Sequence, residues 1–157
     1  MGLLEEIEAI RQLKYRYLRA VDLKDFALLE STFAPDAVSA YDGGRQILEG
    51  RDAIVGWLRN AIEHPFVTLH QAHHPEIELT SATTARGTWY LEDRVINPGP
   101  ARPEMPARSI LSGAAFYADE YEKRDGAWVI TRTGYERTYF EIRPFEPPGT
   151  WYSRWEA

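Results

Sequence analysis

The sequence contains no cysteine among its 157 residues. This absence excludes disulfide bonds, thiolate nucleophiles and metal sites that need thiolate ligands. The sequence also has no apolar run of the roughly 18 residues that a membrane-spanning helix needs. Its start, MGLLEEIEAIRQ, is too acidic for a secretory signal peptide. We therefore expect a cytoplasmic protein whose chemistry relies on imidazole, carboxylate, phenol, hydroxyl or guanidinium groups.

Basic charge is scarce as well. Lys and Arg total 18 against 24 Asp and Glu, which gives a net charge of −6 and a pI near 5.3. Without a basic excess to neutralise phosphates, neither nucleic acid nor an anionic membrane is an expected partner. A glycine-rich phosphate loop and a Gly-x-Ser-x-Gly turn are also missing, which argues against nucleotide-dependent chemistry. The expected partners are a small hydrophobic molecule and further copies of the chain.

Apolar and aromatic residues are plentiful. They make up 44% and 13% of this 18.0 kDa chain, enough for one sizeable core. A charged fraction of 27% and a mean hydropathy of −0.44 argue against a mostly disordered chain and against an integral membrane protein. A single soluble domain is the expectation.

Helical patterns occupy the first part of the chain and extended patterns the second. The first part predicts a helix at 3–23 and then a short helix, which Asp25 caps and which reaches Phe33 before Pro35 stops it. Strands at 37–41 and 46–48 follow. A third helix then begins at Gly50 and Asp52 and ends at His64-Pro65. The second part predicts extended runs at 67–72, 76–80, 85–96, 109–122 and 127–142, with a hairpin turn at Asp125-Gly126 and a longer proline-rich loop at 98–106.

Helices followed by strands predict an α+β domain, in which N-terminal helices cover one face of a curved, mostly antiparallel sheet. We place this domain at residues 1–143. The remaining segment, 144–157, contains Phe145, Trp151 and Trp155, more apolar surface than a free tail usually exposes. We expect it to dock on its own domain or on a neighbouring subunit.

Three of the four histidines lie in one pentapeptide, His70-Gln71-Ala72-His73-His74. In an extended segment His70 and His74 share a face and His73 points away, so three imidazoles do not converge and no metal site is expected. One imidazole could instead act as a general base if a carboxylate orients it, and Asp22 is the candidate. The alternatives are exposed histidines at a strand end and a solvated Asp22.

Tyrosines form a second group of candidates. A phenol that faces an apolar pocket can donate a hydrogen bond to a developing oxyanion or to a departing hydroxyl. Arg137 shares strand parity with Tyr135 and Tyr139, and it could form an ion pair, a cation–π contact or a clamp for an anionic group. Asp93 could pair with Arg94 at the surface or belong to a site. The tyrosines on predicted helix or strand faces are Tyr17, Tyr41, Tyr90, Tyr117, Tyr135 and Tyr139.

These elements and residues together resemble the SnoaL-like branch of the nuclear transport factor 2-like superfamily, over nearly the whole chain up to about residue 143. Within that branch the sequence looks most like bile-acid 7α-dehydratases, and more distantly like scytalone dehydratases and hexachlorocyclohexane dehydrochlorinases. The matching segments are Lys14-Tyr15-Arg16-Tyr17 through Asp22, LESTFAPD at 29–36, residues 50–58, HQAHHPEIE at 70–78, GTWYLED at 87–93, residues 113–128 and TGYER at 133–137.

The resemblance implies a cone-shaped α+β barrel that works without a cofactor and is usually a trimer. Tyr17, Asp22, His70, Asp93 and Arg137 all match the dehydratase pattern. The implied roles are that Asp22 orients the imidazole, His70 removes a proton from carbon, and Tyr17 hydrogen-bonds the carbonyl or leaving group. Arg137 completes the implied catalytic set. The expected substrate-binding residues are Tyr41, Asp93, Trp89 and Tyr135.

Two other members of the superfamily fit less well. The aspartate base of ketosteroid isomerases matches Tyr41 here, and Asp42 is offset by one residue, which on a strand means the opposite face. The second histidine of scytalone dehydratases falls where this chain has residues 88–90. The predicted function is therefore a lyase that dehydrates a hydroxy-steroid or another polycyclic ketone. The alternatives are an isomerase or cyclase on the same scaffold, or a non-catalytic binding protein.

Overall fold

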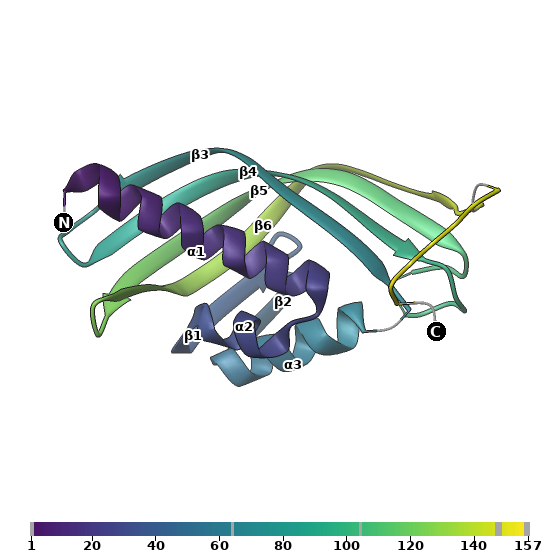
Figure 1. The fold of residues 1–157 in the computed structure, drawn as a ribbon, viewed down its shortest axis with the longest axis horizontal. Coiled ribbons are helices and arrows are strands. Elements are labelled where there is room, and N and C mark those ends of the chain that lie inside the picture. Colours follow the sequence, from purple (N-terminus) through teal and green to yellow (C-terminus); the bar gives the residue numbers. More distant parts are fainter. Residues whose placement is uncertain (1, 64, 104, 147–148, 156–157) are drawn as a thin grey trace.

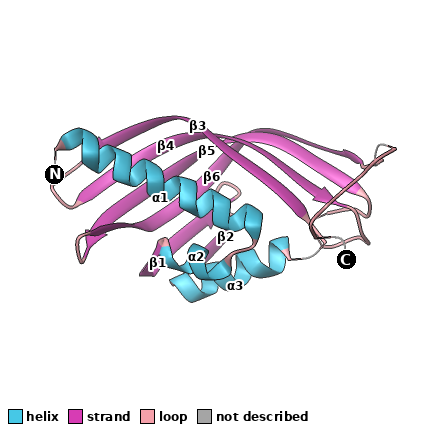
Figure 2. Ribbon diagram, in the orientation of Figure 1, coloured by secondary structure: helices cyan, strands magenta, loops and turns pink. Residues whose placement is uncertain are grey.

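The computed structural model describes residues 2–63, 65–103, 105–146 and 149–155. Its elements follow in the order α1 (Leu3–Leu23), α2 (Phe26–Ser31), β1 (Phe33–Tyr41), β2 (Gln46–Glu49), α3 (Arg51–Ile62), β3 (Val67–Leu79), β4 (Thr84–Asn97), β5 (Ser109–Arg124) and β6 (Ala127–Pro144). Figure 2 shows the helices together on one side of a curved sheet. The predicted α+β class is confirmed.

Within the described residues the strands form one six-stranded sheet in the order β2-β1-β6-β5-β4-β3. Neighbouring strands are antiparallel, except that β1 and β6 are parallel. Figure 1 shows the long strands curving around α1, with α2 and α3 near β1 and β2. This arrangement is the expected cone, built on a mostly antiparallel sheet.

The first helix packs an apolar stripe against the sheet. Ile10, Leu13, Tyr17 and Val21 lie at helical spacing, and each is at most 3% exposed. Lys24 follows the helix in the left-handed region, with φ of 55°, and turns the chain into α2. The stripe puts Tyr17 inside the cone and leaves Asp22 in the last turn, close to the sheet.

The second helix is shorter than predicted, and Phe33 belongs to β1 instead. The hydroxyl of Thr32 donates to the carbonyl of Leu29 over 2.6 Å at the end of α2. The carbonyl of Thr32 then accepts from the N–H of Ile130, with which Phe33 pairs in β6. Local patterns do not reveal a pairing with a strand so distant in sequence, so they extend the helix too far.

The third helix begins after Gly50, whose φ of +87° suits a residue without a side chain. Its buried side chains include Ile54, Leu58 and Ile62, which face the core. The helix ends at Ile62. His64, which was predicted to help close it, lies outside the described residues.

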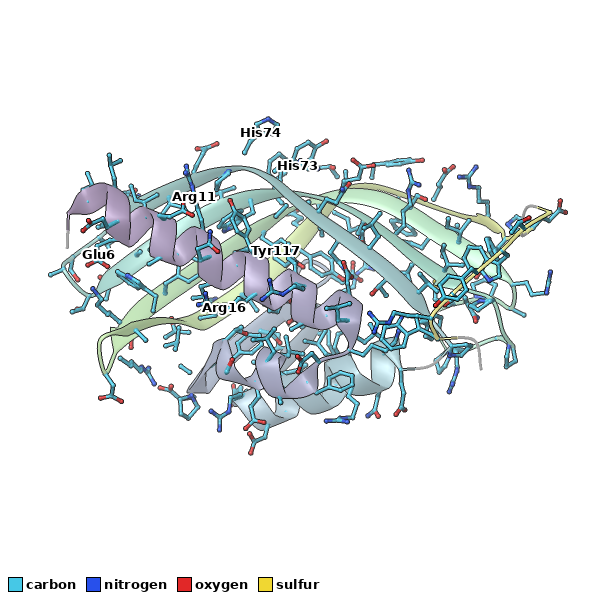
Figure 3. All side chains as sticks on the ribbon, viewed as in Figure 1. Glu6, Arg11, Arg16, His73, His74 and Tyr117 are labelled. Carbon is cyan, nitrogen blue, oxygen red and sulfur yellow. The ribbon has the colours of Figure 1, made fainter. Side chains whose placement is uncertain are left out.

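One bulged strand replaces the two separate runs predicted between residues 67 and 80. The pairing with β4 shifts register between His73 and Glu76, and His74 has a φ of 43°. Figure 3 shows His73 and His74 on the outer side of β3. The prediction that His70 and His74 share a face is wrong, because a bulge interrupts simple alternation.

A second register shift inserts Thr138 into β6 relative to β5. Tyr135 and Arg137 line the interior, whereas Tyr139 is 55% exposed. The prediction that Tyr139 shares a face with Arg137 is therefore wrong, because one extra residue moves every later side chain to the other face.

After β6 the described part of the tail turns back against the chain itself. The rings of Phe145 and Trp151 are 4.8 Å apart, and Nζ of Lys24 lies 3.8 Å from the centre of the Trp155 ring. Burial lowers the pKa of Lys24 to about 8, although the nearby Asp22 opposes this shift. Docking on a neighbouring subunit stays a prediction.

In the described part of the chain, no helix has the length and apolar character that crossing a membrane requires.

Candidate active site

The helices and the concave face of the sheet enclose a cavity of about 570 Å³. This volume falls within the roughly 300–1,000 Å³ of typical small-molecule sites. Its apolar wall includes Leu18, Val21, Leu58, Phe66, Leu91 and Val95. Polar side chains reach it from α1, β1, β3, β4 and β6, so the site depends on the whole cone.

Asp22 and His70 meet at the edge of this cavity. Oδ1 of Asp22 accepts from Nδ1 of His70 over 2.7 Å and from the hydroxyl of Thr68 over 2.9 Å. Oδ2 accepts from the backbone N–H of His70 over 2.9 Å. Three donors thus converge on a carboxylate whose place in the last turn of α1 would otherwise oppose the helix dipole.

This geometry determines which nitrogen of His70 can act as a base. A carboxylate only accepts hydrogen bonds, so Nδ1 carries a proton and Nε2 keeps its lone pair in the neutral ring. The His70 side chain is 13% exposed and lines the cavity. The site therefore holds an oriented imidazole with a free basic nitrogen.

A pair of tyrosine hydroxyls forms a second polar feature of the cavity. The hydroxyl oxygens of Tyr17 and Tyr41 are 3.2 Å apart, and both side chains are buried. Burial raises the pKa of Tyr17 and of Tyr41 well above the usual range, so both phenols stay protonated at neutral pH. They can therefore donate hydrogen bonds to an oxygen that gains negative charge.

Asp93 and Arg137 form the third polar feature. Nη1 and Nη2 of Arg137 donate to the two carboxylate oxygens of Asp93 over 2.6 and 2.7 Å. The side chain of Asp93 is 3% exposed and that of Arg137 is 15% exposed. Burial tends to lower the pKa of Arg137, but the hydrogen bonds and charge of Asp93 outweigh it and raise this pKa above its usual value. The predicted alternative, a surface pair between Asp93 and Arg94, is not what the structure shows.

The structure thus brings most of the predicted site residues into one cavity. Its wall contains Tyr17, Tyr41, His70, Asp93, Tyr135 and Arg137, and Asp22 lies behind His70. Trp89 is the exception, since it is fully buried, its Nε1–H donates to the hydroxyl of Tyr121 over 2.9 Å, and it does not line the cavity. Strand parity places Trp89 on the correct face of β4, but it does not show how far along that strand the cavity extends.

Sequence reasoning missed several residues that shape the site. Trp57 of α3 stacks on Tyr41 with ring centres 5.3 Å apart, and Thr68 helps to hold Asp22. Thr68 precedes His70 by two strand positions, so the shared face was a usable signal. Gly113 lies close to the guanidinium of Arg137. It also gave a signal, because a glycine inside a strand often marks a close approach by another group.

The described residues contain no cluster of three or more His, Asp or Glu side chains that could hold a metal ion. Two pairs of polar groups at the cavity are instead bound to each other, Asp22 to His70 and Asp93 to Arg137. An oriented base, buried phenols and an apolar wall are the parts that a proton transfer from carbon requires.

Comparison with known proteins identifies the family of the chain. Residues 3–134 match the SnoaL-like domain family, so the chain belongs to that family of the nuclear transport factor 2-like superfamily. The structure is similar to a hexachlorocyclohexane dehydrochlorinase (LinA) of type 2, with a TM-score of 0.76 and 25% identity over 94% of this chain and 97% of that one.

Two further solved structures share the fold. A putative scytalone dehydratase from Novosphingobium aromaticivorans DSM 12444 has a TM-score of 0.75 and 23% identity, over 95% of this chain and 97% of that one. A putative aromatic ring hydroxylase from Novosphingobium aromaticivorans DSM has a TM-score of 0.75 and 18% identity, over 91% of this chain and 95% of that one. Proteins named as eliminating enzymes therefore occur among the neighbours, whereas a particular closeness to bile-acid dehydratases stays a prediction.

Proposed function

We propose that this protein is a cofactor-free lyase that eliminates water from a hydrophobic ring ketone, such as a hydroxy-steroid. The observation that supports this most directly is the 2.7 Å hydrogen bond from Nδ1 of His70 to Asp22 beside an apolar cavity. A binding protein has little use for a partly buried carboxylate that orients an imidazole. The name of the dehydrochlorinase with 25% identity also denotes an elimination.

The proposed reaction balances without a cofactor. Nε2 of His70 takes the proton from the carbon next to the substrate carbonyl, and the electron pair of that C–H bond passes into an enolate. The phenols of Tyr17 and Tyr41 donate to the enolate oxygen. The electron pair then returns to form the carbon–carbon double bond, the hydroxyl on the next carbon leaves, and the proton on His70 converts it to water.

Incubation with a panel of hydroxylated 3-oxo-steroids and related ring ketones tests this proposal. We expect at least one substrate to lose the mass of one water, as measured by mass spectrometry. An altered retention time with unchanged mass would indicate the isomerase or cyclase alternative instead. Tight binding of panel members with no product would favour the binding-protein alternative and contradict the lyase.

The outer face of the sheet supports the proposal that the protein is a homo-oligomer, and the resemblance favours a trimer over a dimer. Apolar rings lie exposed there, and Tyr90 stacks on Phe116 with ring centres 5.0 Å apart. We expect light scattering to give a multiple of 18.0 kDa. A monomeric mass would contradict the oligomer.

If the 144–157 tail crosses to a neighbour, a chain that ends at Arg143 should have a lower oligomer mass.

A further inference from the structure

The Asp93–Arg137 pair lies in the cavity wall, and the proton transfer proposed above assigns it no step. Its two parallel hydrogen bonds, of 2.6 and 2.7 Å, engage the end of the guanidinium. Asp93 is almost completely buried, so water screens the pair little. The pair therefore presents a substrate with a guanidinium whose charge is already neutralised.

The sheet is built to hold this pair. Arg137 lies on β6 and Asp93 on β4, so the guanidinium has to reach across β5. Gly113 is the residue of β5 that pairs with Asp93, and a Cβ built there would lie 2.7 Å from Nη1 of Arg137. A real Cβ essentially never lies that close to another atom, so a residue larger than glycine would force Arg137 to move.

Neutralisation of Arg137 has a direct consequence for ligands. An arginine without a partner in an apolar cavity binds a carboxylate through the same two-pronged geometry that Asp93 uses. Here Asp93 already occupies that position, and an incoming anion would also meet the negative charges of Asp93 and Asp22. A neutral carbonyl meets no such repulsion, and it can accept from the phenols of Tyr17 and Tyr41.

We propose that Asp93 is a specificity-determining residue that makes the cavity select uncharged ring ketones over carboxylates of the same size. This inference rests on the proposed function only in placing the substrate in this cavity. Its test measures binding, so it does not depend on turnover.

The test compares two probes with the same ring system, neutral 2-acetylnaphthalene and anionic 2-naphthoate, by calorimetric titration. We expect the wild type to bind the ketone about tenfold or more tightly than the carboxylate. In Asp93→Asn the guanidinium loses its internal carboxylate, so 2-naphthoate should bind about tenfold or more tightly than it does to the wild type, while the ketone changes less.

The two arginines that line the described cavity provide a matched control. Adding Arg137→Gln to Asp93→Asn should abolish the gain in 2-naphthoate affinity, whereas adding Arg102→Gln should leave most of it. A gain that survives Arg137→Gln would overturn the proposal, because the anion would then be bound elsewhere.

The wild-type comparison does not depend on whether any variant folds. If the wild type binds 2-naphthoate as tightly as 2-acetylnaphthalene, or binds neither probe, the proposed selectivity is wrong. Circular dichroism establishes that Asp93→Asn is folded before its affinities are used. Failure of every steroid in the panel to lose water would count against the lyase alone and would leave these binding ratios unchanged.

Discussion

Replacement of His70 by alanine is expected to lower kcat about 10²–10⁴-fold on any substrate that the protein dehydrates, because a general base contributes about that factor. The substitution removes the imidazole that lines the cavity, but it leaves the backbone N–H that donates to Asp22. The protein should therefore stay folded. Steady-state kinetics on the substrate found in the panel, together with circular dichroism, measure both effects.

His73→Ala is the matched control for this experiment. His73 lies three residues away on the outer side of β3, with 39% of its side chain exposed. Its loss should change kcat less than about twofold, since an exposed side chain outside the cavity does not touch the substrate. Equal losses in the two variants would show that the strand, and not the imidazole of His70, is what catalysis needs.

Asp22→Asn tests the orientation of the base in the same assay. One oxygen of Asp22 accepts from the His70 backbone, so a side-chain amide would turn its NH₂ toward Nδ1 of the ring. Nδ1 would then have to accept, and the proton would move to Nε2, the nitrogen that must be free. We expect a loss approaching that of His70→Ala. The dyad is wrong if His70→Ala and Asp22→Asn both keep wild-type turnover.

The second large effect concerns stability and a buried ion pair next to Tyr117, a residue of the cavity wall. Nζ of Lys14 lies 2.7 Å from Oδ2 of Asp119, and both side chains are 0% exposed. Asp119 also accepts from the hydroxyls of Thr133 and Tyr121, and Nζ of Lys14 lies 3.4 Å from the centre of the Tyr117 ring. Burial lowers the pKa of Lys14, although Asp119 opposes this shift.

We expect Lys14→Met to lower the free energy of unfolding by about 3–5 kcal/mol, because it leaves a buried carboxylate without its counter-charge. Urea unfolding followed by tryptophan fluorescence measures this change. Lys14→Met combined with Asp119→Asn should be less destabilising than Lys14→Met alone, since no buried charge then remains unpaired.

An exposed ion pair of similar length provides the comparison. Nη2 of Arg86 lies 2.6 Å from Oε2 of Glu78, but these side chains are 67% and 60% exposed. Arg86→Met should cost at most about 1 kcal/mol, because water screens such pairs. If the two methionine variants lose the same stability, burial is not what makes the Lys14–Asp119 pair important.

The order of the elements could be predicted because it follows from local patterns. The period of the apolar residues identifies α1, and the change to extended runs marks the long strands that begin at Val67. Asp22 and His70 could be singled out as candidates by the rarity of histidine and by the resemblance. Their distance could not be predicted, because it depends on how α1 crosses β3.

The errors arise where one residue changes the register. Thr138 turns Tyr139 outward, and the irregularity around His74 separates it from the face of His70. A bulge depends on how the strand pairs with its neighbour, so strict alternation along a single strand cannot locate it. The place of Trp89 beside Tyr121 likewise depends on β5, which begins many residues later.

The sequence by itself determined the class of this protein, an acidic α+β domain without cysteine whose chemistry has to come from imidazole, carboxylate and phenol groups. Tertiary structure alone decided which of those groups meet. The paired groups that matter most are separated in sequence by 48 residues for Asp22 and His70, by 44 for Asp93 and Arg137, and by 105 for Lys14 and Asp119. The physical reason is burial: partners so distant in sequence acquire their hydrogen bonds and low-dielectric surroundings only when the sheet closes around α1.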